Sequence, residues 1–373
     1  MRIGITCYPT HGGSGVVASE LALGLAEKGH EVHIISYATP FRLRSYHQNV
    51  FIHEVEVASY PLFKYPPYAL SLATKLVDVA REYKLQLIHA HYAVPHAASA
   101  YLARSILGSE NLKTITTLHG TDITLVGLDK SFYQVIKFTI EQSDGVTAVS
   151  HYLQQRTVQE FDIQTDIRVI HNFVDTQRFN RGNNECTREH FAPKGEKILM
   201  HASNFRPVKR VTDVVRIFAE IRKELPVKLL LVGEGPDRLV VQQLVKEYRL
   251  SDDVIFLGEQ DYLETLMSCA DLFILPSEQE SFGLVALEAQ SCGVPVISTP
   301  AGGVPEVVAD GETGFLVPVG EISSMAGKAL QILNDSKLAA TFQKQARQRA
   351  VQYFDSRIII PRYEKFYQEI LNQ

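Results

Sequence analysis

The segment DLFILPSEQESFGLVALEAQSCGVPVIST, residues 271–299, decides the fold of this chain. Its first seven residues form an apolar run that predicts a buried strand, the apolar residues from Leu284 onward predict a helix, and PVIST (295–299) predicts a second strand. A strand, a helix and a strand in this order form the repeating unit of a parallel sheet. Ligands of open parallel sheets bind at the carboxyl ends of the strands, so the loop before the helix is a candidate site.

The same alternation of strands and helices extends over the whole chain, which predicts an α/β fold. Predicted strands of the first half lie at residues 2–6, 31–36, 85–91, 113–120 and 145–150, with a helix at 16–29 that Gly29 should cap. Those of the second half lie at 196–203, 227–235, 254–258, 271–277, 295–299 and 314–318, with a helix at 211–225. The polar stretch 171–195 marks the hinge. We expect two doubly wound domains that face each other, residues 1–170 and 171–354, and a C-terminal helix, 355–373, that Pro361 should kink.

Length and composition agree with this architecture. A chain of 373 residues exceeds the usual size of a single hydrophobic core, and 45% hydrophobic with 21% charged residues is typical of a globular protein. The formal net charge of -5 argues against a nucleic-acid partner. Residues 1–8 resemble a strand rather than a signal peptide, and no apolar run reaches the ~18 residues that span a bilayer.

The four cysteines are scattered. They lie at positions 7, 186, 269 and 292 without a Cys-x-x-Cys spacing, so we expect neither a zinc site nor a disulfide framework. A reducing cytoplasm fits this usage, and we expect a cytoplasmic protein.

A glycine-rich loop follows the first predicted strand. In TCYPTHGGSGVVASELA (6–22), Gly12, Gly13 and Gly15 allow the backbone to approach a ligand, and the helix start behind them offers amides to a phosphate. The loop lacks both the G-x-G-x-x-G pattern and the P-loop lysine, so a plain tight turn is the alternative.

Two glutamates flank the predicted helix start within residues 271–299. Glu280 lies in the loop, and we place Glu288 about two turns into the helix. Amides around Phe282, Gly283 and Leu284 would face an anion, while the carboxylates accept hydrogen bonds from hydroxyls on either side. Amides for an anion with carboxylates for hydroxyls on either side suit a nucleotide sugar, which has a pyrophosphate between two groups of hydroxyls. The alternative is that the helix dipole stabilises Glu280 and that Glu288 is a solvated helix residue.

ESFGLVALEAQSCGVPV (280–296) with STPAGGVPEVVADGETGFLV (298–317) resembles the donor-site signature of the retaining glycosyltransferases of family 4. HGGSG, HGTD, IHNFVD, ASNFRPVKR and LVGEGPD also have counterparts in the same order, so the resemblance covers nearly the whole chain. It implies the GT-B fold: two Rossmann-like domains around a central cleft, the first binding the acceptor, the second the UDP-sugar, and the C-terminal helix packing back on the first.

The resemblance implies donor-site roles for individual residues. Glu280 would bind sugar hydroxyls together with the backbone of Phe282, Gly283 and Leu284, and Glu288 would hold the ribose of the uridine.

Further roles concern the diphosphate and the reacting centre. Lys209 and a nearby arginine would bind the diphosphate; the family's arginine, five residues before the lysine, is Asn204 here, so Arg206 is the expected substitute. The alternative for both cations is a solvated loop charge. His119 would reach the sugar near the reacting centre. Gly13 would approach the β-phosphate, with Gly12 beside it in the loop.

On the acceptor side, the resemblance implies a small hydroxy acid, L-malate. Candidate residues are Ser14, Lys64, Tyr92, Thr121 and Lys130, and Tyr92 matches an acceptor-binding tyrosine of the related enzyme that uses inositol phosphate. Both lysines could equally be exposed loop charges.

No cofactor and no metal ion are expected. The chain has no Asp-x-Asp, and His89, His91 and His96 lack an acidic or cysteine partner, which favours structural or acceptor-side roles.

The implied reaction is transfer of N-acetylglucosamine from UDP-GlcNAc to the hydroxyl of L-malate with retention, the first step of bacillithiol biosynthesis. The implied mechanism is a front-face reaction in which the departing phosphate helps to deprotonate the acceptor. Alternatives are a lipid, polysaccharide or inositol phosphate acceptor, a UDP-GlcNAc 2-epimerase, and a catalytically silent nucleotide-binding module. The aromatic stretch YPLFKYPPYAL (60–70) contains only one lysine, so we expect no stable membrane association; a homo-oligomer is possible.

Overall fold

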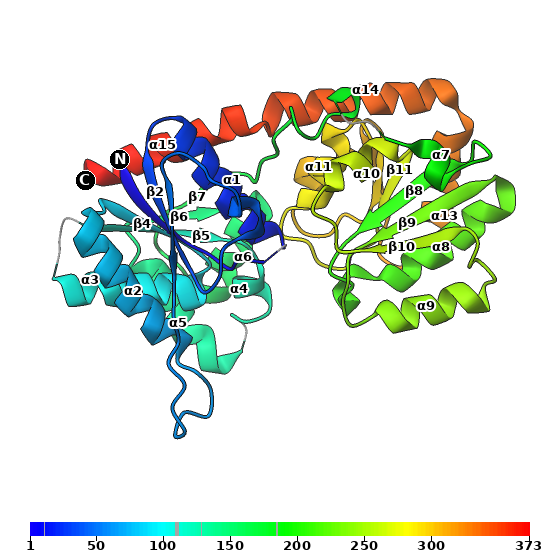
Figure 1. Ribbon diagram of the computed structural model, residues 1–373. Coiled ribbons are helices and arrows are strands. Elements are labelled where there is room, and N and C mark those ends of the chain that lie inside the picture. The colour runs from blue at the N-terminus through cyan, green and yellow to red at the C-terminus, as the bar shows by residue number, and fades with distance from the viewer. Residues whose placement is uncertain (11, 109–111, 128, 184–185) are drawn as a thin grey trace. The chain divides into compact units, whose positions relative to one another are not determined.

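The computed structural model describes residues 1–10, 12–108, 112–127, 129–183 and 186–373. By its internal contacts the chain divides into two compact units (Figure 1). The first consists of Met1–Asn172 with Arg357–Gln373, and the second of Phe173–Ser356.

The first unit contains a parallel sheet of seven strands in the order β3-β2-β1-β4-β5-β6-β7. The strands are β1 (Arg2–Thr6), β2 (Glu31–Ser36), β3 (Val50–Glu54), β4 (Leu87–His91), β5 (Lys113–Leu118), β6 (Gly145–Ala148) and β7 (Ile167–Val169). The helices are α1 (Gly13–Glu27), α2 (Tyr68–Tyr83), α3 (Ala98–Leu107), α4 (Thr121–Thr124), α5 (Lys130–Glu141), α6 (His151–Phe161) and α15 (Ser356–Leu371). α1 and α15 cover one face of the sheet, and α2, α3 and α5 cover the other (Figure 1).

The second unit contains a parallel sheet of six strands in the order β10-β9-β8-β11-β12-β13. The strands are β8 (Lys197–Ala202), β9 (Val227–Val232), β10 (Val254–Gly258), β11 (Leu272–Leu275), β12 (Val296–Ser298) and β13 (Gly314–Leu316). The helices are α7 (Arg188–Phe191), α8 (Val211–Glu224), α9 (Arg238–Glu247), α10 (Leu263–Cys269), α11 (Leu284–Ser291), α12 (Val304–Val307), α13 (Ile322–Asn334) and α14 (Ser336–Tyr353). Short turns of 3-10 helix lie at Phe41–Leu43, Arg181–Asn183 and Pro207–Lys209, and a π-helical turn at Ala93–Ala97.

Both sheets have the strand order of a doubly wound Rossmann fold, in which the order reverses between the first and the fourth strand. In the first unit β1 lies beside β4, with Ile5 opposite His89. In the second, β8 lies beside β11, with Leu199 opposite Leu272. The α/β prediction and the predicted strands are confirmed. The edge strands β3 and β7 were not predicted; β3 is largely exposed and β7 is three residues long, so neither has the apolar run of a central strand.

Central strands are buried on both faces, as parallel strands usually are. In the second unit, Leu199, Phe218 and Ile274 belong to one core cluster of fully buried side chains. In the first, Leu76 of α2 packs in a core cluster with Ile88 of β4. α15 runs through Pro361 and buries Tyr363 and Tyr367. The predicted cap of α1 is confirmed, since Gly29 has φ 85° and its amide donates to the Ala26 carbonyl at 2.9 Å.

The expectation of no disulfide is wrong for one pair of cysteines. Cys186 and Cys269, at the end of α10, form a disulfide with their Cα atoms 5.4 Å apart. The two are 83 residues apart in sequence, so no local spacing signalled the bond. Cys7 and Cys292 are buried free thiols. Among the described residues, no helix is both long and apolar enough to cross a membrane.

Candidate functional sites in the two units

The glycine loop of the first unit leads from β1 into α1. Gly12 is the N-cap, with extended backbone and no side-chain hydrogen bond to the helix start. A Cβ at Gly15 would lie 2.6 Å from the carbonyl oxygens of both Tyr8 and Thr10, so only glycine fits there. The helix therefore begins tightly against the strand end, and its first amides have no intrahelical acceptor. This geometry can receive an anion at Gly12 and Gly13, and a phosphate at this position stays a prediction.

Three predicted acceptor residues come together at the carboxyl ends of β1, β4 and β5. The side chains of Ser14 and Thr121 lie beside the hydroxyl of Tyr92 and act to lower its pKa. Burial raises the pKa of Tyr92 to about 12, and the nearby Asp122 adds to the shift. Tyr92 has φ 89°, a left-handed conformation that is strained for a bulky residue and typical of functional positions. Its backbone amide, bonded to the Thr117 carbonyl at 3.0 Å, holds it there.

A buried carboxylate fixes the two loops that carry these residues. Asp122 accepts hydrogen bonds from the backbone amides of Ala93 at 3.1 Å, Gly120 at 2.8 Å and His119 at 3.3 Å. Burial raises its pKa to about 6, although these amides act in the opposite direction. Asp122 thus ties the end of β4 to the end of β5. It belongs to the HGTD motif, whose aspartate received no role from the sequence.

The histidines of β4 form a buried network below this loop cluster. His89 uses both ring nitrogens, with Thr117 Oγ1 at 2.6 Å and the Tyr367 hydroxyl at 2.7 Å. His91 Nδ1 lies 2.8 Å from Nε2 of His119. Burial lowers the pKa of His89 and of His119 to about 3, so these rings are neutral at physiological pH. These hydrogen bonds support a structural role for His89.

The structure does not bring the two predicted acceptor lysines to Tyr92. Lys64 is exposed in the segment between β3 and α2, which projects away from the sheet (Figure 1), and its ammonium lies 5.5 Å from the centre of the Tyr65 ring. Lys130 is exposed as the first residue of α5. Among the described contacts, none joins either lysine to Tyr92. Both lysines are exposed, which the sequence left open, but only Lys64 lies in a loop, because Lys130 begins α5.

In the second unit, the predicted sugar-binding glutamate pairs with the predicted diphosphate-binding lysine. Lys209 Nζ donates to Glu280 Oε1 at 2.6 Å, although the two residues are 71 positions apart. Both side chains are mostly buried. The Glu280 backbone carbonyl accepts from the amide of Gly303 at 3.1 Å, which ties the loop after β11 to the loop after β12. A partly buried ion pair of this kind marks a polar site at the carboxyl end of the sheet.

α11 begins directly after this loop. Gly283 is its N-cap with φ 90°, a conformation that favours glycine, and Leu284 is its first residue. Phe282 is buried just before the cap. Glu288 is the fifth helical residue, so the prediction of two turns into the helix is wrong; it lies about one turn in. Its side chain is buried, which argues against a solvated helix residue.

A histidine and a serine shape the loop that carries the cations. His201 Nδ1 lies 2.8 Å from the Ile274 carbonyl, which can only accept, so His201 Nε2 must accept from the Ser203 hydroxyl, also at 2.8 Å. Ser203 Oγ in turn accepts from the amide of Phe205 at 3.3 Å. Phe205 has φ 38°, so this chain of hydrogen bonds stabilises a strained turn. Burial lowers the pKa of His201 to about 4, which keeps the ring neutral.

Arg206 and Asn204 lie on the same loop. Arg206 is partly buried, and its Nε has no hydrogen-bond partner among the described residues. Asn204 is exposed, and a side chain at Gly235 would collide with its carbonyl oxygen. Lys209 is therefore neutralised within the unit, whereas Arg206 has an unpaired donor. His201 and Ser203 were not singled out from the sequence, because a histidine in a buried strand looks like any core residue.

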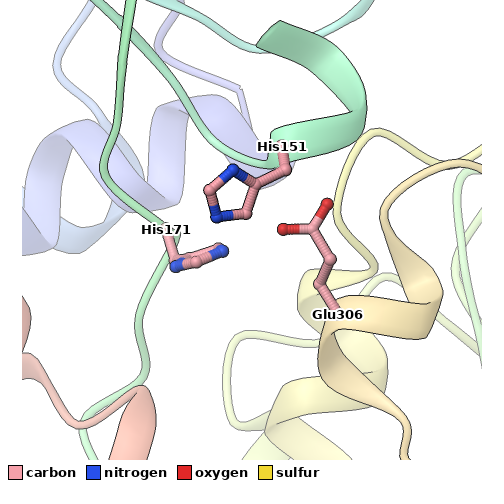
Figure 2. Close-up of side chains that lie close together, drawn as sticks. All are labelled: His151, His171 and Glu306. Atoms are coloured by element: carbon pink, nitrogen blue, oxygen red, sulfur yellow. The ribbon is translucent and has the colours of Figure 1, made fainter. Parts of the chain in front are cut away.

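Figure 2 shows three further side chains with metal-ligating chemistry. His151, the first residue of α6, and His171, after β7, belong to the first unit, where their ring centroids lie 5.6 Å apart in an edge-to-face arrangement. Glu306 lies in α12 of the second unit. Two histidines supply fewer ligands than protein zinc sites use, so the pair does not define a metal site.

In comparisons with known proteins, each of the two units matches a glycosyltransferase family model. Residues 11–178 match the model of glycosyltransferase family 4, and residues 183–349 match that of glycosyl transferases group 1. The chain is 48% identical over 372 residues to N-acetyl-alpha-D-glucosaminyl L-malate synthase of Bacillus anthracis, covering 100% of this chain and 97% of that protein. It is 34% identical over 198 residues to D-inositol 3-phosphate glycosyltransferase of Mycolicibacterium smegmatis, covering 50% of this chain and 44% of that one.

Solved structures agree on the fold. A glycosyltransferase from Rickettsia africae superimposes with a TM-score of 0.83 at 24% identity, covering 99% of this chain and 98% of the other. Anabaena HepE, solved in complex with UDP and glucose, gives 0.83 at 22% identity and 99% coverage of both chains. The chain therefore belongs to glycosyltransferase family 4 and is a glycosyltransferase with the GT-B fold.

Proposed function

We propose that the chain transfers N-acetylglucosamine from UDP-GlcNAc to the hydroxyl of L-malate with retention, forming an α linkage in the first step of bacillithiol biosynthesis. The observation that carries this proposal is the 48% identity to a GlcNAc-malate synthase over the whole chain. Lipid and polysaccharide acceptors, and epimerase chemistry, have no comparable support. The proposed setting is the cytoplasm, and the proposed reaction needs no metal ion or cofactor.

The second unit is the proposed donor site. Glu280 would accept hydrogen bonds from sugar hydroxyls, with backbone groups at Phe282, Gly283 and Leu284 beside it. The first amides of α11 supply a positive dipole end. Glu288, one turn further along the same helix, would bind the ribose. The ion pair between Lys209 and Glu280 keeps both side chains ordered before the substrate arrives, which reduces the entropy lost on binding.

The leaving diphosphate requires charge stabilisation as the glycosidic bond breaks. Arg206 and Lys209 would supply the cations, and Gly12 and Gly13 would supply backbone amides at a helix start. Preorganised donors aimed at developing charge are usually the largest single contribution to a rate of this kind. The departing phosphate oxygen would then accept the proton of the malate hydroxyl, so no protein base is required.

The first unit is the proposed acceptor site. Tyr92, Ser14 and Thr121 present three neighbouring hydroxyl groups, and such groups suit a carboxylate or hydroxyl ligand. The raised pKa of Tyr92 keeps its hydroxyl protonated, and therefore able to donate, across any ordinary assay pH. Lys64 and Lys130 would add attraction for the malate carboxylates from more exposed positions.

The test is UDP release from UDP-GlcNAc in the presence of L-malate, D-malate, inositol phosphate or no acceptor. We expect release with L-malate, an α-linked product by NMR of its anomeric proton, and an unchanged rate in EDTA. Formation of UDP-ManNAc without an acceptor would establish an epimerase instead. Release with inositol phosphate and not with L-malate would assign a different acceptor.

A further inference from the structure

His91, at a buried strand end, shares a hydrogen bond with His119, the histidine expected to reach the sugar near the reacting centre. His91 is the last residue of β4, and His119 follows β5, its parallel neighbour. His91 Nδ1 and His119 Nε2 are 2.8 Å apart, and both side chains are buried. Burial lowers the pKa of both rings, for His119 to about 3, so both are neutral. A neutral imidazole carries one N–H and one lone pair, so one ring of the pair must donate to the other.

The surroundings of His91 decide which ring donates. Its other nitrogen, Nε2, is buried and has no hydrogen-bond partner among the described residues. If His119 donated, the only ring proton of His91 would sit on this Nε2 as a buried, unpaired N–H. If His91 donates, only a lone pair is left unpaired there. Orphaned buried N–H groups are rarer than under-satisfied acceptors, so the second arrangement is favoured.

We propose that His91 is a positioning residue that donates from Nδ1 to Nε2 of His119 and thereby holds His119 as the tautomer protonated on Nδ1. His119 then presents a hydrogen-bond donor to an oxygen of the donor sugar. This role toward the sugar rests on the proposed function. The opposite tautomer would present a lone pair, which can accept from a hydroxyl but cannot donate to an oxygen.

The backbone and the ring of His119 are held by different groups. Asp122 accepts from the His119 amide and fixes the main chain, whereas His91 fixes the direction of the ring and its proton. The ring of Tyr92 lies against His119 with centroids 5.2 Å apart and limits its rotation. His91 is therefore the group that selects the tautomer.

The decisive measurement is the tautomer of His119 in the wild-type chain. In protein with 15N-labelled histidine, long-range 1H–15N correlation distinguishes a protonated ring nitrogen from one with a lone pair, and His119→Gln identifies the signals of His119. We expect Nδ1 protonated and Nε2 unprotonated. The reverse assignment in the wild type overturns the proposal without any variant at position 91.

Variants at His91 test whether it selects this state. His91→Leu should change the His119 tautomer and lower kcat about tenfold, the size of one misdirected neutral hydrogen bond, with the malate KM unchanged. His91→Asn places an amide donor near the position of Nδ1 and should restore both the tautomer and most of kcat. The control is His89→Leu, an equally buried change on the same strand that leaves the His119 hydrogen bond intact; it should leave the tautomer unchanged.

Two outcomes distinguish a His91 that selects the tautomer from one that only fills space. If His91→Leu lowers kcat while the His119 tautomer stays the same, His91 is merely structural and the proposal is wrong. If the wild-type chain releases no UDP with any acceptor, the proposed function fails, and so does the role of His119 toward a sugar. The NMR measurement of the His119 tautomer needs no substrate, so it still tests whether His91 donates to His119.

Discussion

The two units repeat one sheet topology and use it for different chemistry. In both, candidate residues cluster at the carboxyl ends of the strands beside the reversal of strand order, after β1 and β4 in the first unit and after β8 and β11 in the second. The first unit fills this position with buried histidines, hydroxyls around Tyr92 and a single buried carboxylate, Asp122. The second fills it with opposite charges, Lys209 and Glu280, and a helix start. A shared topology therefore fixes where a site lies, and the side chains decide what it binds.

Removing charge from the second unit should have the largest effect. Glu280→Ala deletes the carboxylate that pairs with Lys209 and is proposed to hold the sugar, and we expect UDP release with malate to fall by a factor of about 100 or more. The control is Glu278→Ala, since Glu278 is an exposed carboxylate two residues away. A normal rate for Glu280→Ala would disprove the donor-site assignment and remove the contrast between the units.

The buried carboxylate of the first unit should reveal itself in the pH dependence of stability. The pKa of Asp122 is raised from 3.8 to about 6 in the folded chain, so the folded state binds more protons between these values. Stability from this group is therefore present at low pH and declines as pH rises from about 4 to 6, by up to about 3 kcal/mol. Chemical denaturation at several pH values should show this slope in the wild type and its loss in Asp122→Asn. An identical slope in both proteins would contradict a raised pKa for the buried carboxyl group of Asp122.

The loop that carries Arg206 and Lys209 depends on a neutral hydrogen-bond chain within a charged site. Ser203→Ala removes the link between His201 and the Phe205 amide. We expect the KM for UDP-GlcNAc to rise about tenfold with the malate KM unchanged, because the cations lose their fixed positions. Ser298→Ala is the matched control, since Ser298 is a buried serine of the same sheet whose hydroxyl bonds only the Leu275 carbonyl in the described contacts. Equal KM values for UDP-GlcNAc in the two variants would show that the hydrogen bonds of Ser203 do not position Arg206 and Lys209.

The hydroxyl cluster of the first unit should affect the acceptor alone. Tyr92→Phe keeps the ring and removes the hydroxyl that lies beside Ser14 and Thr121, so we expect the malate KM to rise about fivefold while the UDP-GlcNAc KM is unchanged. Tyr65→Phe, at an exposed tyrosine, should have no effect. A change in the KM for UDP-GlcNAc, with the malate KM unchanged, would show that Tyr92 acts on the donor and not on the acceptor.

The smallest effect is expected at Lys130. Its ammonium is exposed and screened by solvent, so Lys130→Ala should raise the malate KM only about twofold, and less at high salt. Initial rates at two salt concentrations measure this. A tenfold rise would indicate a direct contact with malate.

The strands were predictable because central parallel strands are continuous apolar runs, and β8 and β11 are examples. The edge strand β3 was missed because much of it is exposed. Glu280 and Lys209 were assigned to one site by resemblance, but spacing could not predict their direct pairing across 71 positions. The link from Asp122 to the Ala93 amide and the disulfide were missed for the same reason, since they join residues 29 and 83 positions apart.

The contact between His89 and Tyr367 spans 278 positions and joins a central strand to the last helix. A ribosome therefore makes all of Phe173–Ser356 before it makes the residues that complete the core of the first unit. A fragment that stops at Asn172 would expose the sheet face that α15 covers, so the first unit is a poor candidate for expression by itself. Dissection of this enzyme into halves is better done by joining 357–373 to residue 172 through a linker than by truncation.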